Sequence, residues 1–317
     1  MSGAVELTIF AIPKRFEGHF GMIQRNAARS WSRLTPRPQI ILLGADAGTA
    51  EMAAEIGALH LPEVAVSPAG APRLDDVFAK GQQAAAGATV CFVNADIVLT
   101  QTWMSAVQTV ARWRPQFLLV GRRWNLDVLQ PIDFEAPRWE PDLVATAQAR
   151  GQQATNMYVD YFAFPRGMIT DIPPFAIGRP GYDNWLLWRT RQRGIPLVDV
   201  SAEAPVIHQN HDFSHINKGP DALAGTDAYW KGQDTKRNAE LAGDWSRSFT
   251  TDHATHIVTA GAVRPAFQKR YLDARVETLR RRFINLTRPL RHGLGIDAAF
   301  VARLRNRVMS RKDDRRP

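Results

Sequence analysis

The sequence predicts an α/β protein with a mostly parallel central sheet, helices on both faces of that sheet, and a basic helical extension at the C-terminus. Apolar runs rich in β-branched residues alternate with stretches of helical periodicity over residues 5–99. This alternation is typical of parallel strands joined by helical crossovers. The concentration of Lys and Arg after residue 263 and a helical spacing of apolar residues there indicate the extension. We therefore expect one large domain over residues 1–263 and a tail over residues 264–317.

The first third of the chain contains the clearest patterns. Residues 5–12 read VELTIFAI, a continuous apolar run that stops at Pro13, which has no backbone donor. Residues 19–33 carry apolar side chains along one helical stripe. On the same criteria we expect strands over 39–43, 60–66, 89–93 and 97–99, and helices over 47–58 and 74–86.

The second half of the chain is less regular. We expect strands over 117–121, 158–164, 196–200 and 205–207, and a helix over 183–193 after a loop rich in proline and glycine. Residues 217–262 are polar and weakly periodic, and the sequence supports no prediction for them.

The positive charge of the chain is concentrated in its tail. The net charge is +9, but residues 264–317 hold 16 Lys and Arg against 5 Asp and Glu, which leaves residues 1–263 at −2. A nearly neutral body without a recognised binding motif argues against a nucleic-acid partner.

The lone cysteine and the absence of targeting patterns bear on location. Cys91 lies in an apolar run, where we expect a buried, unreactive thiol. The N-terminus lacks the basic-then-apolar order of a signal peptide, and no apolar run is long enough to span a bilayer. We therefore expect a cytoplasmic protein.

Three strand ends are expected to meet at one edge of the sheet. In open α/β sheets, ligands bind outside the carboxyl ends of the strands. This rule places three segments around one crevice: Pro13-Lys14-Arg15, Gly44-Ala45-Asp46 and Asn94-Ala95-Asp96.

Asn94 and Asp96 follow the apolar segment VCFV. Burying an unpaired carboxylate there would be costly, so Asp96 should face the crevice. Two oxygen-bearing side chains on the same side of an extended chain could together hold a hard divalent cation that bridges phosphate oxygens. The alternative is a turn in which both side chains only satisfy backbone donors.

Two further carboxylates have both a functional and a structural interpretation. Asp183 stands at the start of the expected helix and could offer its carboxylate to an acceptor hydroxyl, with Tyr182 and Trp185 presenting aromatic faces to a sugar. The alternative is that Asp183 caps the helix while the aromatic rings pack. Asp160, between apolar neighbours, could contact a substrate, but pairing with an internal arginine is favoured.

Histidines are dense after the last expected strand. His208, His211 and His215 lie within eight residues of a chain that has eight histidines. Neutral imidazole is a good metal ligand, and this spacing could bring two rings to one ion. A zinc site is disfavoured because no cysteine or HExxH partner accompanies them. The alternative is a polar loop whose histidines form local hydrogen bonds.

Taken together and in this order, these segments resemble a GT-A-fold glycosyltransferase over roughly residues 5–215. The matching elements are the first strand with Ile12-Pro13-Lys14, the helix start at Leu74-Asp75-Asp76-Val77-Phe78, the strands VCFVNADIVL and VDYFAFPRG, the segment GYDNW, and a late strand that ends in histidine. The resemblance implies a Rossmann-like GT-A fold, with a donor half near residues 1–115 and an acceptor half near residues 116–216.

The resemblance also implies a metal site and a catalytic base. In that family a D-x-D motif holds Mg²⁺ or Mn²⁺ against the diphosphate of a nucleotide-sugar. Asp96 matches the metal ligand, whereas Asn94 departs from the motif and is better placed to contact the donor. His208 matches the late-strand metal ligand, with His211 as a further candidate. Asp183 matches the catalytic base of inverting members.

The remaining candidates are divided between the two substrates. Lys14, Arg15 and Arg73 would bring positive charge near the pyrophosphate. We expect the donor side to comprise Pro13, Lys14, Arg15, Asp46, Arg73, Asn94 and Asp96, and the acceptor side to comprise Asp160, Arg179, Tyr182 and Trp185.

The function implied is metal-dependent transfer of a sugar, with inversion, from a nucleoside-diphosphate sugar to a hydroxyl of a glycan or lipid-linked acceptor. A nucleotidyltransferase or nucleotide-sugar hydrolase would use the same metal crevice. However, a nucleotidyltransferase should have a glycine-rich, lysine-bearing loop after the first strand, where this chain has only IPKR. A non-catalytic carbohydrate- or membrane-binding protein on the same fold is the third class.

The tail has the pattern of an amphipathic basic helix. Between Gln268 and Leu290, apolar residues recur at steps of three or four, and arginines occupy much of the remaining surface. Such a helix could lie on the anionic inner face of a membrane, near a lipid-linked acceptor. The alternative is a helix packed on the large domain with its basic face in solvent.

Overall fold

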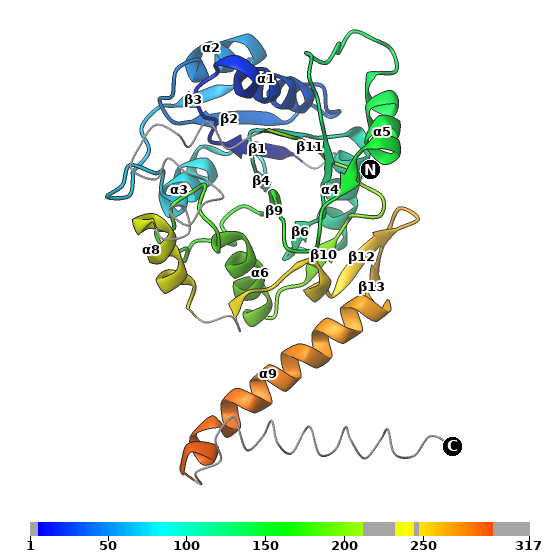
Figure 1. Cartoon of the computed structure of the whole chain (residues 1–317). Helices are drawn as coiled ribbons and strands as arrows, with labels where there is room; N and C mark the ends of the chain where they lie inside the picture. Colours follow the sequence, from blue (N-terminus) through cyan, green and yellow to red (C-terminus); the bar gives the residue numbers. More distant parts are fainter. Residues whose placement is uncertain (1–5, 212–231, 244–246, 294–317) are drawn as a thin grey trace. The chain divides into compact units, whose positions relative to one another are not determined.

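The computed structural model describes residues 6–211, 232–243 and 247–293 (Figure 1). The chain divides into two compact units, Met1–Phe267 and Gln268–Pro317. Strand β13 (Ala262–Pro265) crosses the expected boundary after residue 263, because it pairs with β12 (His256–Thr259) of the large unit. The large unit therefore ends slightly later than the charge pattern suggested.

A nine-stranded sheet forms the centre of the described part of the large unit. Its strand order is β13-β12-β10-β6-β9-β4-β1-β2-β3. Besides β12 and β13, the strands are β1 (Leu7–Ala11), β2 (Gln39–Leu43), β3 (Leu59–Leu61), β4 (Thr89–Val93), β6 (Leu118–Val120), β9 (Tyr161–Pro165) and β10 (Leu197–Asp199). β9 runs antiparallel to β4 and β6, and β13 to β12, whereas the other pairings are parallel. The predicted mostly parallel α/β sheet is confirmed.

A second, smaller sheet was not predicted. Its order is β5-β11-β7-β8, with β5 (Ile97–Val98), β11 (Ile207–Gln209), β7 (Trp124–Leu126) and β8 (Gln152–Gln153). β5 pairs antiparallel with β11, so that Ile97 lies opposite His208. This pairing joins the end of the first half of the chain to the late histidine segment.

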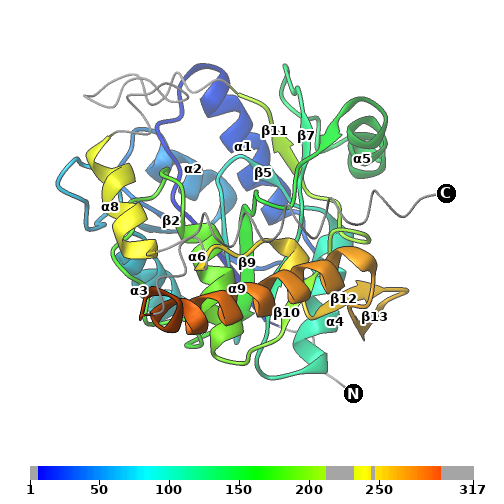
Figure 2. The ribbon, with the colours of Figure 1, turned by 60° about the horizontal axis from the view of Figure 1, so that its bottom comes forward.

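Helices cover both faces of the large sheet (Figures 1 and 2). They are α1 (Gly18–Ser32), α2 (Thr49–Ile56), α3 (Leu74–Ala84), α4 (Gln101–Trp113) and α6 (Tyr182–Gln192). α5 (Trp139–Arg150) packs on β7 and β8 of the small sheet, and α8 (Gln233–Ala242) packs on α6. The sequence patterns predicted α1, α2, α3 and α6, but not α4, α5 or α8. α4 begins at a favourable cap, because the Thr100 hydroxyl accepts a hydrogen bond from the Trp103 backbone at 3.2 Å.

Alternation along β4 explains why both faces are apolar. Cys91 and Val93 belong to a core cluster with α1, α2 and α4. Phe92 points to the other face, where its ring lies 5.1 Å from that of Phe78 of α3. The Cys91 thiol is buried and its pKa is raised by burial, as expected for an unreactive cysteine.

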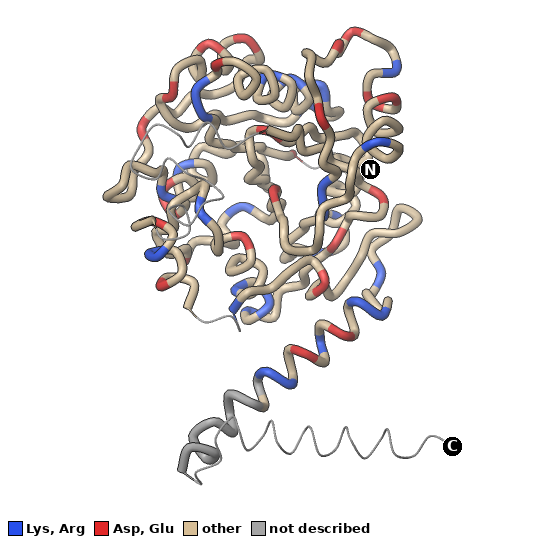
Figure 3. The backbone as a smooth tube through the Cα atoms, in the orientation of Figure 1, with Lys and Arg blue, Asp and Glu red and all other residues tan. Residues whose placement is uncertain are grey.

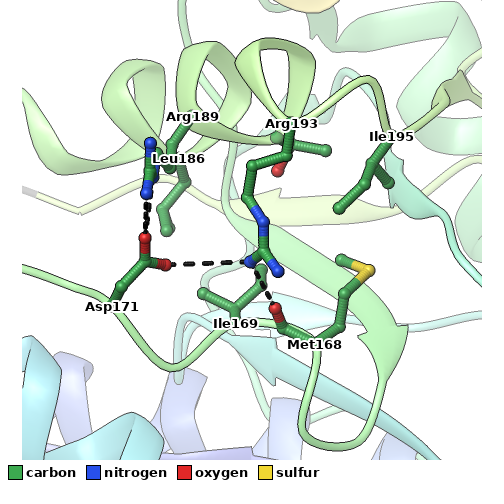
Figure 4. Close-up of a pocket in the computed structure, with 8 residues that line it drawn as sticks. Met168, Ile169, Asp171, Leu186, Arg189, Arg193 and Ile195 are labelled. Carbon is green, nitrogen blue, oxygen red and sulfur yellow. Dashed lines mark hydrogen bonds and ion pairs between the residues drawn. The ribbon is translucent and has the colours of Figure 1, made fainter.

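The loop after β9 is fastened to α6 by charged contacts. Asp171 accepts hydrogen bonds from Arg189 and lies 3.8 Å from Arg193, and Arg193 also donates to the Met168 carbonyl at 2.7 Å (Figure 4). These contacts fix the position of α6, whose first turn carries Asp183.

The second unit contains the predicted basic helix, α9 (Lys269–Gly293). Basic and acidic residues alternate along the described beginning of α9 (Figure 3). Its apolar stripe is exposed at Leu272, Val276, Leu279 and Phe283. Within the described parts of the chain, every helix is too short or too polar to cross a bilayer.

Candidate metal centre

The turn after β4 brings Asp96 beside two histidines. β4 ends at Val93, and Asp96 immediately precedes β5, whose pairing with β11 places His208 across from Ile97. The Asp96 Oδ2 atom lies 3.1 Å from His211 Nε2 and 3.6 Å from His208 Nε2. Ligand atoms of these three residues all lie within 4.8 Å of one another, which is the spacing of a site for one metal ion.

The hydrogen bonding of this group fits a bound cation. Asp96 Oδ1 and His208 Nδ1 are buried and have no partner among the described residues. Buried polar atoms are rarely left unsatisfied, so an ion with open coordination positions would account for them. Burial lowers the pKa of His208, which favours the neutral imidazole that binds metals.

Asp96 is held in its ionised form. Burial opposes ionisation, but the facing His208 and His211 and the more distant Arg123 outweigh that effect and hold the pKa of Asp96 below its usual range. A permanent carboxylate beside imidazole nitrogens is a suitable ligand set for Mn²⁺, whereas Mg²⁺ prefers oxygen ligands throughout.

Buried amides fix the backbone around this group. Gln209 donates to the Ile23 carbonyl at 2.8 Å and to the Asp96 carbonyl at 3.1 Å, and its oxygen accepts from Asn26 at 2.9 Å. These contacts tie β11 and α1 to the Asp96 turn. The sequence patterns did not single out Gln209 or Asn26, because nothing in their spacing reveals a contact between distant segments.

Asn94 is bound to Asp160 through both its side chain and its backbone. Its side-chain nitrogen donates to Asp160 Oδ1 at 2.8 Å, and its backbone nitrogen donates to the Asp160 carbonyl. Asp160 also pairs with Arg123 at 2.6 Å, the internal arginine partner favoured by the sequence analysis. Arg123 follows the carboxyl end of β6, so the strand-end rule could have found it.

Lys14 lies within electrostatic reach of Asp96, Asp46 and Arg179. Burial and the nearby Arg179 lower the pKa of Lys14 to about 8, even though Asp96 and Asp46 act in the opposite direction. These interactions bring the residues that follow β1, β2 and β4 near one another, and they place Arg179, which was expected on the acceptor side, near the donor-side Lys14. The backbone of Lys14 is held by Gln24 of α1, which bonds both its nitrogen and its carbonyl.

The loop that carries Arg179 is itself fastened. Asn238 of α8 is fully buried, accepts from the Ala176 nitrogen at 2.8 Å and donates to the Ala176 carbonyl at 3.0 Å. The buried Asn238 side chain takes the place of a backbone hydrogen-bond partner for the loop at Ala176. It therefore limits the movement of Arg179, which lies in the same loop, relative to Lys14.

Two of the expected donor-side cations make contacts elsewhere. Arg15 is exposed and lies 3.5 Å from Glu17, and Arg73 forms a two-nitrogen pair with Asp75 of its own helix. Pro13 is buried and ends the first strand segment. The structure thus brings Lys14 near Asp46 and Asp96, while the ion pairs of the Arg15 and Arg73 side chains are local.

Asp183 lies in the first turn of α6, two residues after the N-cap residue Gly181. The N-cap residue Gly181 has no side chain, and backbone hydrogen bonds, that of Asn184 foremost, stabilise the Asp183 carboxylate, so Asp183 also serves the start of the helix. Burial, supported by the negative charge of Asp160, raises the pKa of Asp183 to about 6. A carboxylate with this pKa is well matched to accepting a proton near neutral pH.

The aromatic residues beside Asp183 pack in the core, as in the second of the two interpretations given above for them. Tyr182 and Trp185 are buried, and the Trp185 ring lies 5.4 Å from Phe175 and 6.1 Å from Trp188. They form the apolar face of α6 and do not present open rings, because the helix needs that face to pack on the sheet. The third histidine, His215, lies outside the described residues.

Comparison with known proteins gives a remote likeness. No family model matches the sequence, and neither does any curated relative. The chain is similar to the crystal structure of glucosyl-3-phosphoglycerate synthase from Mycobacterium tuberculosis in complex with Mn²⁺, uridine diphosphate and glucosyl-3-phosphoglycerate, with 18% identity, coverage of 72% of this chain and 79% of that chain, and a TM-score of 0.40.

A second similar structure is GalNAc-T7 with UDP, GalNAc and Mn²⁺, at 14% identity over 77% of this chain and 49% of that chain, with a TM-score of 0.46. These values describe a remote likeness only. The function proposed below therefore rests on the residues of the site.

Proposed function

We propose that this protein is a metal-dependent glycosyltransferase that moves a sugar from a nucleoside-diphosphate sugar to an acceptor hydroxyl. One observation carries the proposal. The carboxyl edge of the sheet gathers a ready ligand set, Asp96 with His208 and His211, next to the cations Lys14 and Arg179. Such a site suits a cation bound to a diphosphate, with additional positive charge beside it.

The donor would be held at the Asp96 group. Asp96, His208 and His211 would hold Mn²⁺ or Mg²⁺, which supplies Lewis acidity toward the diphosphate oxygens when it is bound. Lys14 and Arg179 would offset the charge that develops on the departing diphosphate. Donor contacts from Pro13, Asp46 and Asn94 belong to the same proposal, since their segments border the crevice.

Asp183 would act as the base on the acceptor side. As the acceptor oxygen attacks the anomeric carbon, the bond from that carbon to the diphosphate oxygen breaks and the hydroxyl proton passes to Asp183. In-line attack opposite the leaving group inverts the anomeric configuration. Asp160 supports this role indirectly, because its charge keeps the Asp183 carboxylate basic.

A membrane surface is the proposed partner of α9. Its apolar stripe is exposed, and helical spacing places Arg275 and Arg280 on either side of it. An amphipathic helix of this kind lies in the interface of an anionic bilayer and would bring a lipid-linked or glycan acceptor within reach. Cosedimentation with phosphatidylserine vesicles should exceed that with phosphatidylcholine vesicles and fall about tenfold for Leu279→Glu. Equal binding to both vesicle types would refute the proposed membrane contact of α9.

Binding of nucleoside diphosphates tests the central proposal. A thermal-shift screen of UDP, GDP, ADP and their common sugar conjugates should show a concentration-dependent rise in melting temperature that requires Mn²⁺. Asp96→Ala should abolish the Mn²⁺-dependent part. No shift with any of these ligands at millimolar Mn²⁺ would contradict the proposed function.

A further inference from the structure

An exposed aromatic side chain lies in a segment that is hydrogen-bonded to the residue after the proposed base. Tyr158 is 54% exposed and its neighbour Met157 is 41% exposed, although both are large apolar side chains that are normally covered in part. They shortly precede Asp160, whose charge acts on Asp183. An exposed aromatic ring next to a catalytic group is a candidate contact for the substrate.

The backbone of this segment is fastened at both ends. The Met157 carbonyl accepts a hydrogen bond from Asn184 at 3.3 Å, and Asn184 is buried directly after Asp183. At the other end, the Asp160 carbonyl accepts from the Asn94 nitrogen at 2.8 Å. The segment therefore runs from the base to the turn that carries Asp96.

The ring of Tyr158 has a fixed orientation. The guanidinium carbon of Arg123 lies 5.1 Å from the ring centroid, over one face. Arg123 is held by Asp160 at 2.6 Å and by Asn125 at 2.8 Å. Since Arg123 covers one face, the exposed area of Tyr158 belongs to the opposite face and the ring edge.

We propose that Tyr158 is the stacking platform of the acceptor site and that the acceptor presents a pyranose ring. This inference rests on the proposed transferase function. A sugar ring carries an apolar face of C–H groups, which packs on an aromatic face, while its hydroxyls stay at the edge. Stacking on Tyr158 orients one such hydroxyl toward Asp183. The unbranched Met157 adapts to the substituents of the ring.

The test separates the acceptor site from the donor site. Methyl and p-nitrophenyl α- and β-pyranosides of the common hexoses serve as acceptor probes, and their binding is followed by saturation-transfer NMR in the presence of UDP and Mn²⁺. The proteins are the wild type, Tyr158→Ala, Tyr158→Phe and the control Leu129→Ala, which removes another exposed apolar side chain. UDP–Mn²⁺ affinity of each variant is measured by calorimetry.

We expect Tyr158→Ala to weaken pyranoside binding about tenfold, whereas Tyr158→Phe and Leu129→Ala stay within about twofold of the wild type. UDP–Mn²⁺ affinity should be the same in all four proteins, because the platform contacts the acceptor and not the nucleotide. Equal pyranoside binding by Tyr158→Ala and the wild type overturns the platform.

Two outcomes distinguish this inference from the proposed function. A wild type that binds UDP and Mn²⁺ but none of the pyranosides overturns the pyranose acceptor while the donor site stands. A wild type that binds no UDP in the presence of Mn²⁺ overturns the proposed function and the platform with it.

Discussion

Asp96 and Asp183 are both largely buried carboxyl groups, yet their surroundings move their pKa values in opposite directions. Asp96 faces His208, His211 and the charge of Arg123, which hold its pKa low. Burial and the nearby charge of Asp160 raise the pKa of Asp183 to about 6, although backbone hydrogen bonds act in the opposite direction. Residue type therefore does not assign the role. The neighbours make one group a permanent ligand and the other a proton acceptor.

The largest effect should follow from removing the low-pKa carboxylate. Asp96→Asn keeps the shape but removes the charge, so we expect loss of Mn²⁺-dependent UDP binding and a fall in transfer of at least about 10³-fold. Calorimetry with UDP and Mn²⁺ and a transfer assay measure the two effects. Retained Mn²⁺-dependent binding would show that Asp96 is not the ligand. His19→Ala, an exposed residue nearby, is the control.

Removing the high-pKa carboxylate should affect the reaction without affecting donor binding. We expect Asp183→Asn to lower kcat for transfer by about 10²- to 10⁴-fold, the usual contribution of a positioned base, while the affinity for UDP and Mn²⁺ is unchanged. Steady-state kinetics and calorimetry provide the two readouts. Transfer at the wild-type rate would remove Asp183 from the mechanism.

The pH profile sharpens the same contrast. Asp183 must be deprotonated to accept a proton, so kcat/KM should rise with pH up to about 6, where burial has placed its pKa. Lys14 must be protonated to offset the diphosphate, and burial with the adjacent Arg179 lowers its pKa to about 8, so activity should fall above that pH. Lys14→Arg should remove the upper limb and leave the lower one in place. A flat profile between pH 5 and 9 would be inconsistent with both assignments.

The smallest expected effect concerns the choice of metal. Two imidazoles beside one carboxylate should favour Mn²⁺ over Mg²⁺ by about tenfold in the concentration needed for half-maximal UDP binding. His211→Asp, which exchanges a nitrogen for an oxygen ligand, should narrow this preference. Fluorescence titration of both metals into the wild type and the variant measures it. An unchanged ratio would exclude His211 from the ligand set.

β1, β2 and β4 were predictable because they are buried apolar runs. Strands 39–43 and 89–93 were predicted with the bounds that the structure has. β3, predicted over 60–66, spans only Leu59–Leu61 and is partly exposed. In the second sheet, strands were predicted at β5 and near β11, but β7 and β8 have three and two residues, too few to show any periodicity, and only their pairing defines them.

The candidate site divides in the same way. Lys14, Asp46 and Asp96 follow strand ends, and the rule that ligands bind at the carboxyl ends of parallel strands predicted that they lie near one another. Arg123, Gln209 and Tyr158 required tertiary contacts with Asp160, Asn26 and the crevice, which no local pattern encodes. Tyr182 and Trp185 were wrongly expected to be open to the acceptor, because the sequence does not show whether an aromatic ring is exposed or packed in the core.

The reversed direction of β9 has a consequence for how such a protein can change. A parallel strand must be reached by a long crossover, whereas the antiparallel β9 enters the sheet from the crevice side. The segment that holds Met157 and Tyr158 is thus an entry loop, which Asn184 and Asn94 hold at its ends. Insertions or substitutions there could diversify the accepted substrate while the strand pairing and the Asp96 cluster are inherited unaltered.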